Sequence, residues 1–165
     1  MAKQEKSLTM TVLMTPDMVN FSGKVHGGII LKLLDQVAYV CAAKYAKSYV
    51  VTAALDNVFF KQSINVGELV TFYANINYVG RSSMEVGIKV VAVDLLTDAK
   101  RHTNSCYFTM VAVDEQGISI AVPRLQLETD AEKKLFAAGA LRKQQRQEML
   151  VQNSDLQFDI EEDEI

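Results

Sequence analysis

Several residue types are scarce in this 165-residue chain, and each scarcity excludes a class of protein. The two cysteines, Cys41 and Cys106, match no zinc or redox spacing, and the two histidines, His26 and His102, are too isolated for a metal site. The longest apolar run, residues 37–43, is far shorter than the roughly 20 residues of a membrane-spanning helix. The amino terminus also lacks the apolar stretch of a signal peptide. We therefore expect no metal, no membrane partner and a cytoplasmic protein with reduced thiols.

A strongly basic surface is missing as well. The formal net charge is −3, and residues 152–165 hold six acidic residues without any Lys or Arg. Without these six, the 17 basic residues stand against 14 acidic ones, so the body of the chain is near +3. A binder of duplex nucleic acid needs a basic stripe, so we predict no nucleic-acid partner. A small anionic ligand remains compatible with this charge.

Apolar residues are plentiful, at 49% of the chain, and 165 residues are enough for one domain with a sizeable core. Ile30, Leu33, Leu34, Val37 and Cys41 recur at helical spacing and predict a long helix over residues 27–47. Later segments alternate with period two and predict strands, while a polar helix is expected near the carboxyl terminus. The predicted strands cover residues 7–14, 49–60, 70–78, 84–92 and 102–113, and the polar helix covers 129–147.

The order of these elements predicts an α+β architecture. Hairpin-length connections join consecutive strands, so neighbouring strands are expected to be antiparallel. A sheet that buries one long apolar helix must curve around it. The free edges of such a sheet offer a route to a dimer.

One segment resembles a known family. Residues 20–35 run from Asn20 through His26-Gly27-Gly28 to Asp35, and they resemble the active-site segment of hotdog-fold acyl-CoA thioesterases. Residues 56–60 leading to 66–70 resemble the family's second and third strands, although Glu68 stands where Asp is frequent. Residues 79–84 with 108–114 resemble the later hairpin of the bacterial acyl-CoA hydrolases related to brain acyl-CoA hydrolase. Together the resemblance covers about residues 8–125.

The resemblance implies a hotdog fold, in which a curved antiparallel β-sheet wraps around one long central helix, here with an extra C-terminal helix. We expect a hotdog thioesterase domain at 1–125, a helical extension at 126–150 and an acidic, disordered tail at 151–165. It also implies a homo-oligomer with the dimer as its minimal unit, assembled into a trimer of dimers. The implied activity is hydrolysis of an acyl-CoA to a fatty acid and free coenzyme A. No further cofactor is implied, because coenzyme A is part of the substrate and product.

Glycines at a helix start suit this chemistry, because the first helical N–H groups lack intrahelical partners and lie at the positive end of the dipole. We expect Gly27 to donate its N–H to the oxyanion, with Gly28 as a second donor. Without the resemblance, a Gly-Gly pair would simply mark a junction between loop and helix.

Asp35 lies on a polar stripe with Lys32 and Gln36, which by periodicity alone would be a solvated helix face. The resemblance makes it a general base toward water or a direct nucleophile. Gly27 and Asp35 are eight residues apart, roughly 12 Å along one helix, so we expect two chains to form each site at the dimer interface. Asn20 is expected to orient water or hold Asp35, or else to be an Asx-type loop residue.

The remaining candidates are less specific. His26 fits a structural role in the loop better than a general base. Coenzyme A phosphates could bind at Arg81, Ser82, Ser83, Lys61 and Arg124, each of which is equally a solvated turn residue. The acyl chain could pass Phe59, Phe60 and Met84, although core packing is the more usual role for any one of them. Two alternatives stay open at this point, a hotdog hydratase or dehydratase acting on acyl thioesters and a non-catalytic acyl-CoA-binding sensor.

Overall fold

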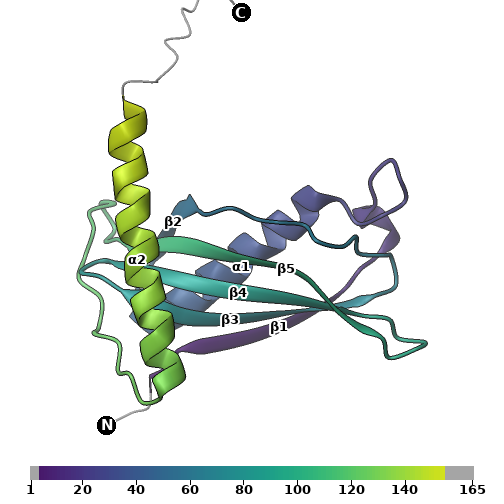
Figure 1. Ribbon diagram of the computed structural model, residues 1–165, viewed down its shortest axis with the longest axis horizontal. Helices are drawn as coiled ribbons and strands as arrows, with labels where there is room; N and C mark the ends of the chain where they lie inside the picture. The colour runs from purple at the N-terminus through teal and green to yellow at the C-terminus, as the bar shows by residue number, and fades with distance from the viewer. Residues whose placement is uncertain (1–3, 155–165) are drawn as a thin grey trace, which may run out of the picture.

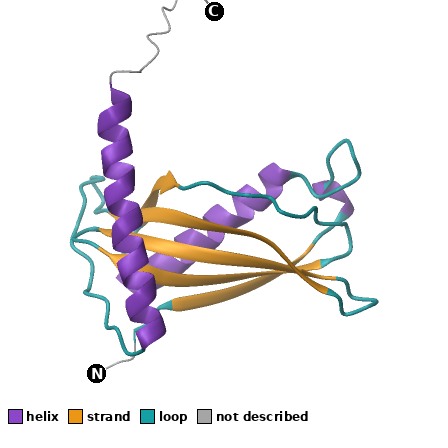
Figure 2. Ribbon diagram, in the orientation of Figure 1, coloured by secondary structure: helices purple, strands orange, loops and turns teal. Residues whose placement is uncertain are grey.

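The computed structural model describes residues 4–154, which form a five-stranded antiparallel sheet with a helix on each face (Figures 1 and 2). The strands follow the spatial order β1-β3-β4-β5-β2, so β1 and β2 form the two edges. The strands are β1 (Ser7–Leu13), β2 (Val50–Leu55), β3 (Leu69–Val79), β4 (Ser83–Val93) and β5 (Lys100–Ala112), and the helices are η1 (Pro16–Met18), α1 (Gly27–Ala46) and α2 (Asp130–Asn153). This is the α+β hotdog arrangement that the sequence predicts.

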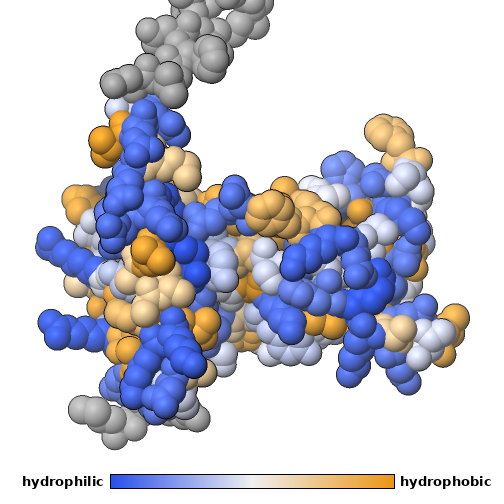
Figure 3. Space-filling model, in the orientation of Figure 1, coloured by the Kyte–Doolittle hydropathy of each residue, from blue (hydrophilic) through white to orange (hydrophobic). Residues whose placement is uncertain are grey.

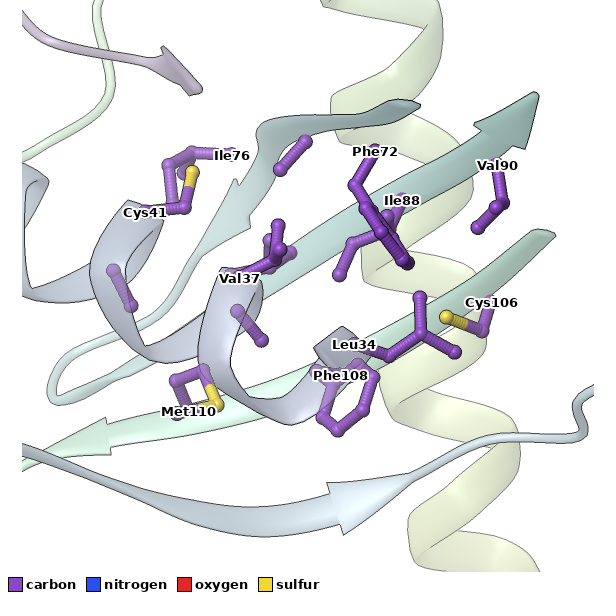
Figure 4. Close-up of a cluster of buried hydrophobic side chains, with 14 of the residues drawn as sticks. Leu34, Val37, Cys41, Phe72, Ile76, Ile88, Val90, Cys106, Phe108 and Met110 are labelled. Carbon is purple, nitrogen blue, oxygen red and sulfur yellow. The ribbon is translucent and has the colours of Figure 1, made fainter. Parts of the chain in front are cut away.

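The core lies between α1 and the concave face of the sheet (Figure 4). Leu34, Val37 and Cys41 are buried on the helix, as their spacing predicts, whereas Leu33 is only partly buried. They face Phe72 and Phe108 of the sheet, which are also buried. Burying one such side chain contributes about 1.5–3 kcal/mol, so this layer is the main source of stability.

The chain leaves the sheet earlier than predicted after β2. A strand over 49–60 is wrong beyond Leu55, where the register with β5 ends at the Leu55–Phe108 pair. Residues 56–61 then follow β5 through two separated hydrogen bonds, from the Asp56 N–H to the Tyr107 carbonyl and from the Lys61 N–H to the Thr103 carbonyl. Two contacts across six residues do not make a ladder, so this stretch is irregular.

Helix α2 packs against the convex face of its own sheet. A Cβ at Gly139 would lie 2.6 Å from Cβ of Tyr78, so the helix backbone touches the sheet closely. The ring of Phe136 lies 4.8 Å from that of Tyr78, and Arg142 binds the buried carboxylate of Glu85. A capping box begins the helix, because Thr129 and Glu132 exchange side-chain and backbone hydrogen bonds.

The carboxyl-terminal boundary also differs from the prediction. Helix α2 continues through Asn153 rather than ending near residue 147, so residues 151–153, expected in the tail, are helical. The predicted disorder of the acidic tail concerns residues 155–165, which lie outside the described residues. Figure 3 shows a largely hydrophilic surface over α2. Neither α1 nor α2 is long and apolar enough to cross a membrane.

Candidate active site

The first turn of α1 leaves one glycine N–H available. The His26 side chain caps the helix, and its Nδ1 accepts the Gly28 N–H at 2.9 Å. Gly28 is therefore engaged by the cap, which corrects the expectation that it serves as a second oxyanion donor. The Gly27 N–H has no acceptor among residues 4–154 and lies at the positive end of the helix dipole. This arrangement agrees with a structural role for His26.

Asn20 organises the loop before α1. Its Oδ1 accepts hydrogen bonds from the backbone N–H of Ser22 at 2.9 Å, from the Ser22 hydroxyl at 2.7 Å and from the backbone N–H of Lys24 at 3.2 Å. The side-chain oxygen of Asn20 is therefore an Asx-type acceptor within the loop, which was one of the two expectations for this residue. Its Nδ2 makes no hydrogen bond within the described chain, so the amide can donate to a ligand but has no oxygen left to accept.

Asn20 and Gly27 line the same cavity, of about 300 Å³. The ring of Phe60 forms one wall, since its Cζ lies 3.7 Å from where a Gly27 Cβ would be. Gln62 and Ser63 continue this wall. A free N–H donor, an amide donor and an aromatic wall thus meet at one small opening at the start of α1.

Asp35 lies elsewhere, on the exposed face of α1. Its Oδ1 accepts a 2.7 Å hydrogen bond from the Thr52 hydroxyl on the edge strand β2. The two residues line a second cavity of about 600 Å³ together with Tyr39 and Tyr49. Thr52 was not singled out from the sequence, and its one signal is a hydroxyl in the otherwise apolar run VVTAAL.

A single chain does not bring Gly27 and Asp35 into one cavity. The Gly27 cavity and the Asp35 cavity share no lining residue. Gly27 and Asp35 are eight positions apart, roughly 12 Å along the helix, which is too far for one small thioester carbonyl to touch both groups.

The residues expected to bind coenzyme A phosphates lie at two separate places. Arg81 and Arg124 are exposed and near one another, since the Val122 N–H donates to the Arg81 carbonyl at 2.9 Å. Ser82 and Ser83 complete this turn, and Ser83 pairs with Val111 on β5. The Lys61 N–H donates to the Thr103 carbonyl on the same strand β5. Thr103 lies eight residues before Val111, so Lys61 is roughly 26 Å from the turn of Ser83. Within one chain these cations do not form a single phosphate site.

The aromatic and methionine candidates separate as well. Met84 is fully buried in the core, whereas Phe59 and Phe60 are 66% and 50% exposed. Met84 is therefore a core residue, whereas Phe59 and Phe60 are not packed in the core. Of these three side chains, Phe60 is the one that reaches the Gly27 cavity.

Residues 4–154 contain two buried cysteines and no cluster of metal-ligating side chains. Burial raises the pKa of Cys41 and of Cys106 to about 12, so neither thiol is a thiolate at neutral pH. Among the described residues, no group of three or more His, Cys, Asp and Glu side chains could hold a metal ion. Asp35 is the carboxylate that lines one of the two cavities.

Comparison with known proteins identifies the family. Residues 22–99 match the Thioesterase superfamily. Protein VdlD of Helicobacter pylori is 48% identical over 139 residues, which is 84% of this chain and 79% of that protein. The human cytosolic acyl coenzyme A thioester hydrolase is 34% identical over 77% of this chain and 34% of its own length.

Solved structures agree with this result. An apo-hexameric acyl-CoA thioesterase is 37% identical with a TM-score of 0.83, covering 87% of this chain and 92% of that one. An acyl-CoA hydrolase from Staphylococcus aureus, solved with butyryl coenzyme A and coenzyme A, is 28% identical with a TM-score of 0.83, covering 92% and 93%. The chain therefore belongs to the Thioesterase superfamily. Within it, the chain falls among the acyl-CoA thioester hydrolases.

Proposed function

We propose that this protein hydrolyses acyl-CoA thioesters to a fatty acid and free coenzyme A, at two equivalent sites in each dimer. The observation that carries the proposal is the free Gly27 N–H at one end of α1 and the Thr52-bound Asp35 carboxylate two turns further on. Two antiparallel α1 helices related by a twofold axis place the glycine of one chain opposite the aspartate of the other. The reacting carbonyl then lies between them.

Each group has one task in this reaction. The Gly27 N–H stabilises the oxyanion that forms on the carbonyl, a contribution of about 3 kcal/mol for one such donor. Asp35 either removes a proton from the attacking water or attacks the carbonyl itself to give an anhydride that water then opens. Asn20 donates from Nδ2 to the water or to Asp35. The carbon–sulfur bond breaks, and the coenzyme A sulfur takes up a proton.

A relative supports this choice of residues. The S. aureus acyl-CoA hydrolase was studied as alanine variants of an asparagine, an aspartate and a threonine, which are separated by 15 and 17 residues. Asn20, Asp35 and Thr52 have the same order and the same two separations. We therefore add Thr52 to the proposed site as the residue that orients the Asp35 carboxylate.

The assembly belongs to the same proposal. Strands β1 and β2 are sheet edges in the described chain, and edge pairing between chains is a common route to a dimer. Two relatives are hexameric thioesterases, which supports a trimer of dimers here. The hotdog domain at 1–125 would carry the site and the extension at 126–150 would cover the sheet. The cytosolic human relative supports a cytoplasmic location.

The coenzyme sites remain a proposal too. In an oligomer, the turn of Arg81, Ser82 and Ser83 with Arg124 would bind phosphates of a coenzyme whose thioester enters a neighbouring site, and Lys61 would bind them from another chain. No cofactor is required for the steps above. Hydrolysis is therefore expected to continue at full rate after dialysis against a chelator, and its loss with recovery by a metal would contradict this part.

Mixed oligomers test the shared site directly. Asn20→Ala and Asp35→Ala each impair both sites of their own dimer, and free thiol release from a series of acyl-CoA substrates measures the loss. Coexpression in equal amounts makes half of the dimers hybrid, and each hybrid has one intact site. About a quarter of the wild-type rate should therefore return.

The alternatives predict different results. If one chain supplied the whole site, mixing would restore nothing. Hydration of an enoyl-CoA without thiol release would identify a hydratase. Tight binding of coenzyme A without any turnover would identify a sensor.

A further inference from the structure

The 56–61 segment belongs to no strand, and its Phe60 forms one wall of the proposed oxyanion site. Its Phe60 ring lies against Gly27, with Cζ 3.7 Å from the position of a Cβ there, and lines the cavity that also contains Asn20. The ring is 50% exposed, so core packing does not hold it in place. Its position depends on how the backbone of the segment is fixed.

Helix α2 fixes the beginning of this segment. Arg146 Nε donates to Asp56 Oδ1 at 3.0 Å, and a terminal guanidinium nitrogen donates to Asp56 Oδ2 at 2.9 Å. The two side chains are only 20% and 26% exposed, and a bidentate pair of this kind is directional as well as attractive. The pair crosses from the helical extension to the first residue after β2.

The other end of the wall is fixed from within the hotdog domain. Arg101 Nη1 donates to the Ser63 carbonyl at 3.0 Å and to Gln62 Oε1 at 3.3 Å. Its Nη2 donates to the buried carboxylate of Glu68 at 2.7 Å. One arginine therefore holds each end of the stretch that carries Phe60, and the first of them comes from α2.

We propose that Arg146 is a positioning residue through which α2 holds Phe60 against the Gly27 cavity and thereby sets the affinity for the acyl thioester. This inference rests on the proposed function. Among the described residues, Arg146 hydrogen-bonds neither to α1, which presents the Gly27 N–H, nor to Thr52, which holds Asp35. Its loss therefore removes substrate binding that is common to the ground state and the transition state, which raises KM more than it lowers kcat.

Four variants test the proposal. Arg146→Ala should raise KM about ten-fold and change kcat less than about three-fold, because it weakens uniform binding. Asp56→Ala should do the same, and the double variant should add nothing further because both remove one contact. The charge-reversed pair Arg146→Asp with Asp56→Arg should recover most of the wild-type KM. The control is Lys133→Ala, which removes an exposed cation from the same helix where it pairs with Asp130, and should leave both constants unchanged.

Thermal unfolding and size-exclusion chromatography of each variant separate positioning from a loss of fold or assembly. If Arg146→Ala left KM unchanged, or lowered kcat alone, the positioning role would be wrong. It would be wrong also if Lys133→Ala raised KM equally, since that would indicate general loosening of α2. Failure of the proposed function is a separate result, because wild-type protein would then release no thiol and Asp35→Ala would match it.

Discussion

Thr52 donates its hydroxyl to Asp35 Oδ1 at 2.7 Å and so joins the edge strand β2 to the exposed face of α1. The bond fixes one oxygen of a carboxylate that is otherwise exposed. Since β2 ends the sheet, the oriented carboxylate stands where a second chain can approach. A carboxylate held in one rotamer is ready for attack without reorganisation.

Replacing Thr52 tests this orientation. Thr52→Val keeps the shape of the side chain and removes the donor, so the carboxylate loses a charge-assisted hydrogen bond of about 1.5–3 kcal/mol. We expect kcat to fall about ten- to a hundred-fold, measured by free thiol release, with little change in KM. Thr52→Ser retains the hydroxyl and should recover most of the rate. A Val variant as active as wild type would remove Thr52 from the site.

His26 provides a second prediction, because a cap and a general base respond differently to substitution. Asn is a strong helix cap but not a base, so His26→Asn should retain most of kcat and most of the stability. His26→Ala should cost about 1 kcal/mol in the free energy of unfolding, measured with urea. A fall in kcat for His26→Asn comparable to that of Asp35→Ala would instead assign the proton transfer to His26.

Gly139 predicts the sign of a stability change. In an exposed helix, Gly→Ala stabilises by about 1 kcal/mol, but here the new methyl group would lie 2.6 Å from Cβ of Tyr78. Gly139→Ala should therefore destabilise the protein by about 1–3 kcal/mol through displacement of α2. The control, Ala137→Gly on the exposed side of the same helix, measures the propensity term alone. A stabilised Gly139→Ala protein would show that α2 is not docked at this point.

Glu132 connects α2 to the amino-terminal residues in a pH-dependent way. A hydrogen bond from Lys6, joined by backbone N–H groups, lowers the pKa of Glu132 from its ordinary 4.5 to about 2. A lowered pKa stabilises the fold above the unfolded value, and this stabilisation is lost as the pH falls toward 2. Gln retains the capping box without the charge.

The difference in the free energy of unfolding between wild type and Glu132→Gln should thus be constant above about pH 5 and shrink below about pH 4.5. Urea unfolding followed by circular dichroism measures it. The matched control is Asp130→Asn, which removes an exposed carboxylate that pairs with Lys133 on the helix surface. A difference that stays constant from about pH 6 to about pH 3 would contradict the lowered pKa.

The regular elements were predictable because their signals are local. The spacing from Ile30 to Cys41 predicted α1, and alternating residues predicted the strands, since burial on one face imposes these periods wherever the element packs. The prediction was wrong at residues 56–60, whose β-branched and aromatic character resembles a strand. The regular pairing with β5 ends there at Asp56-Asn57, two residue types that strands disfavour, and Arg146, 90 residues away, binds Asp56 at this point, a contact that no local pattern reports.

The candidate site divides in the same way. Asn20, Gly27 and Asp35 stand out within one short segment, so the sequence by itself determined the fold class and predicted the residues of the site. Only the tertiary structure decided that the Gly28 N–H donates to the His26 cap, that Thr52 binds Asp35 and that Arg146 of α2 binds Asp56. These contacts depend on the directions of side chains from elements distant in sequence. Periodicity fixes which face a residue occupies, whereas the packing of the whole chain fixes what it meets there.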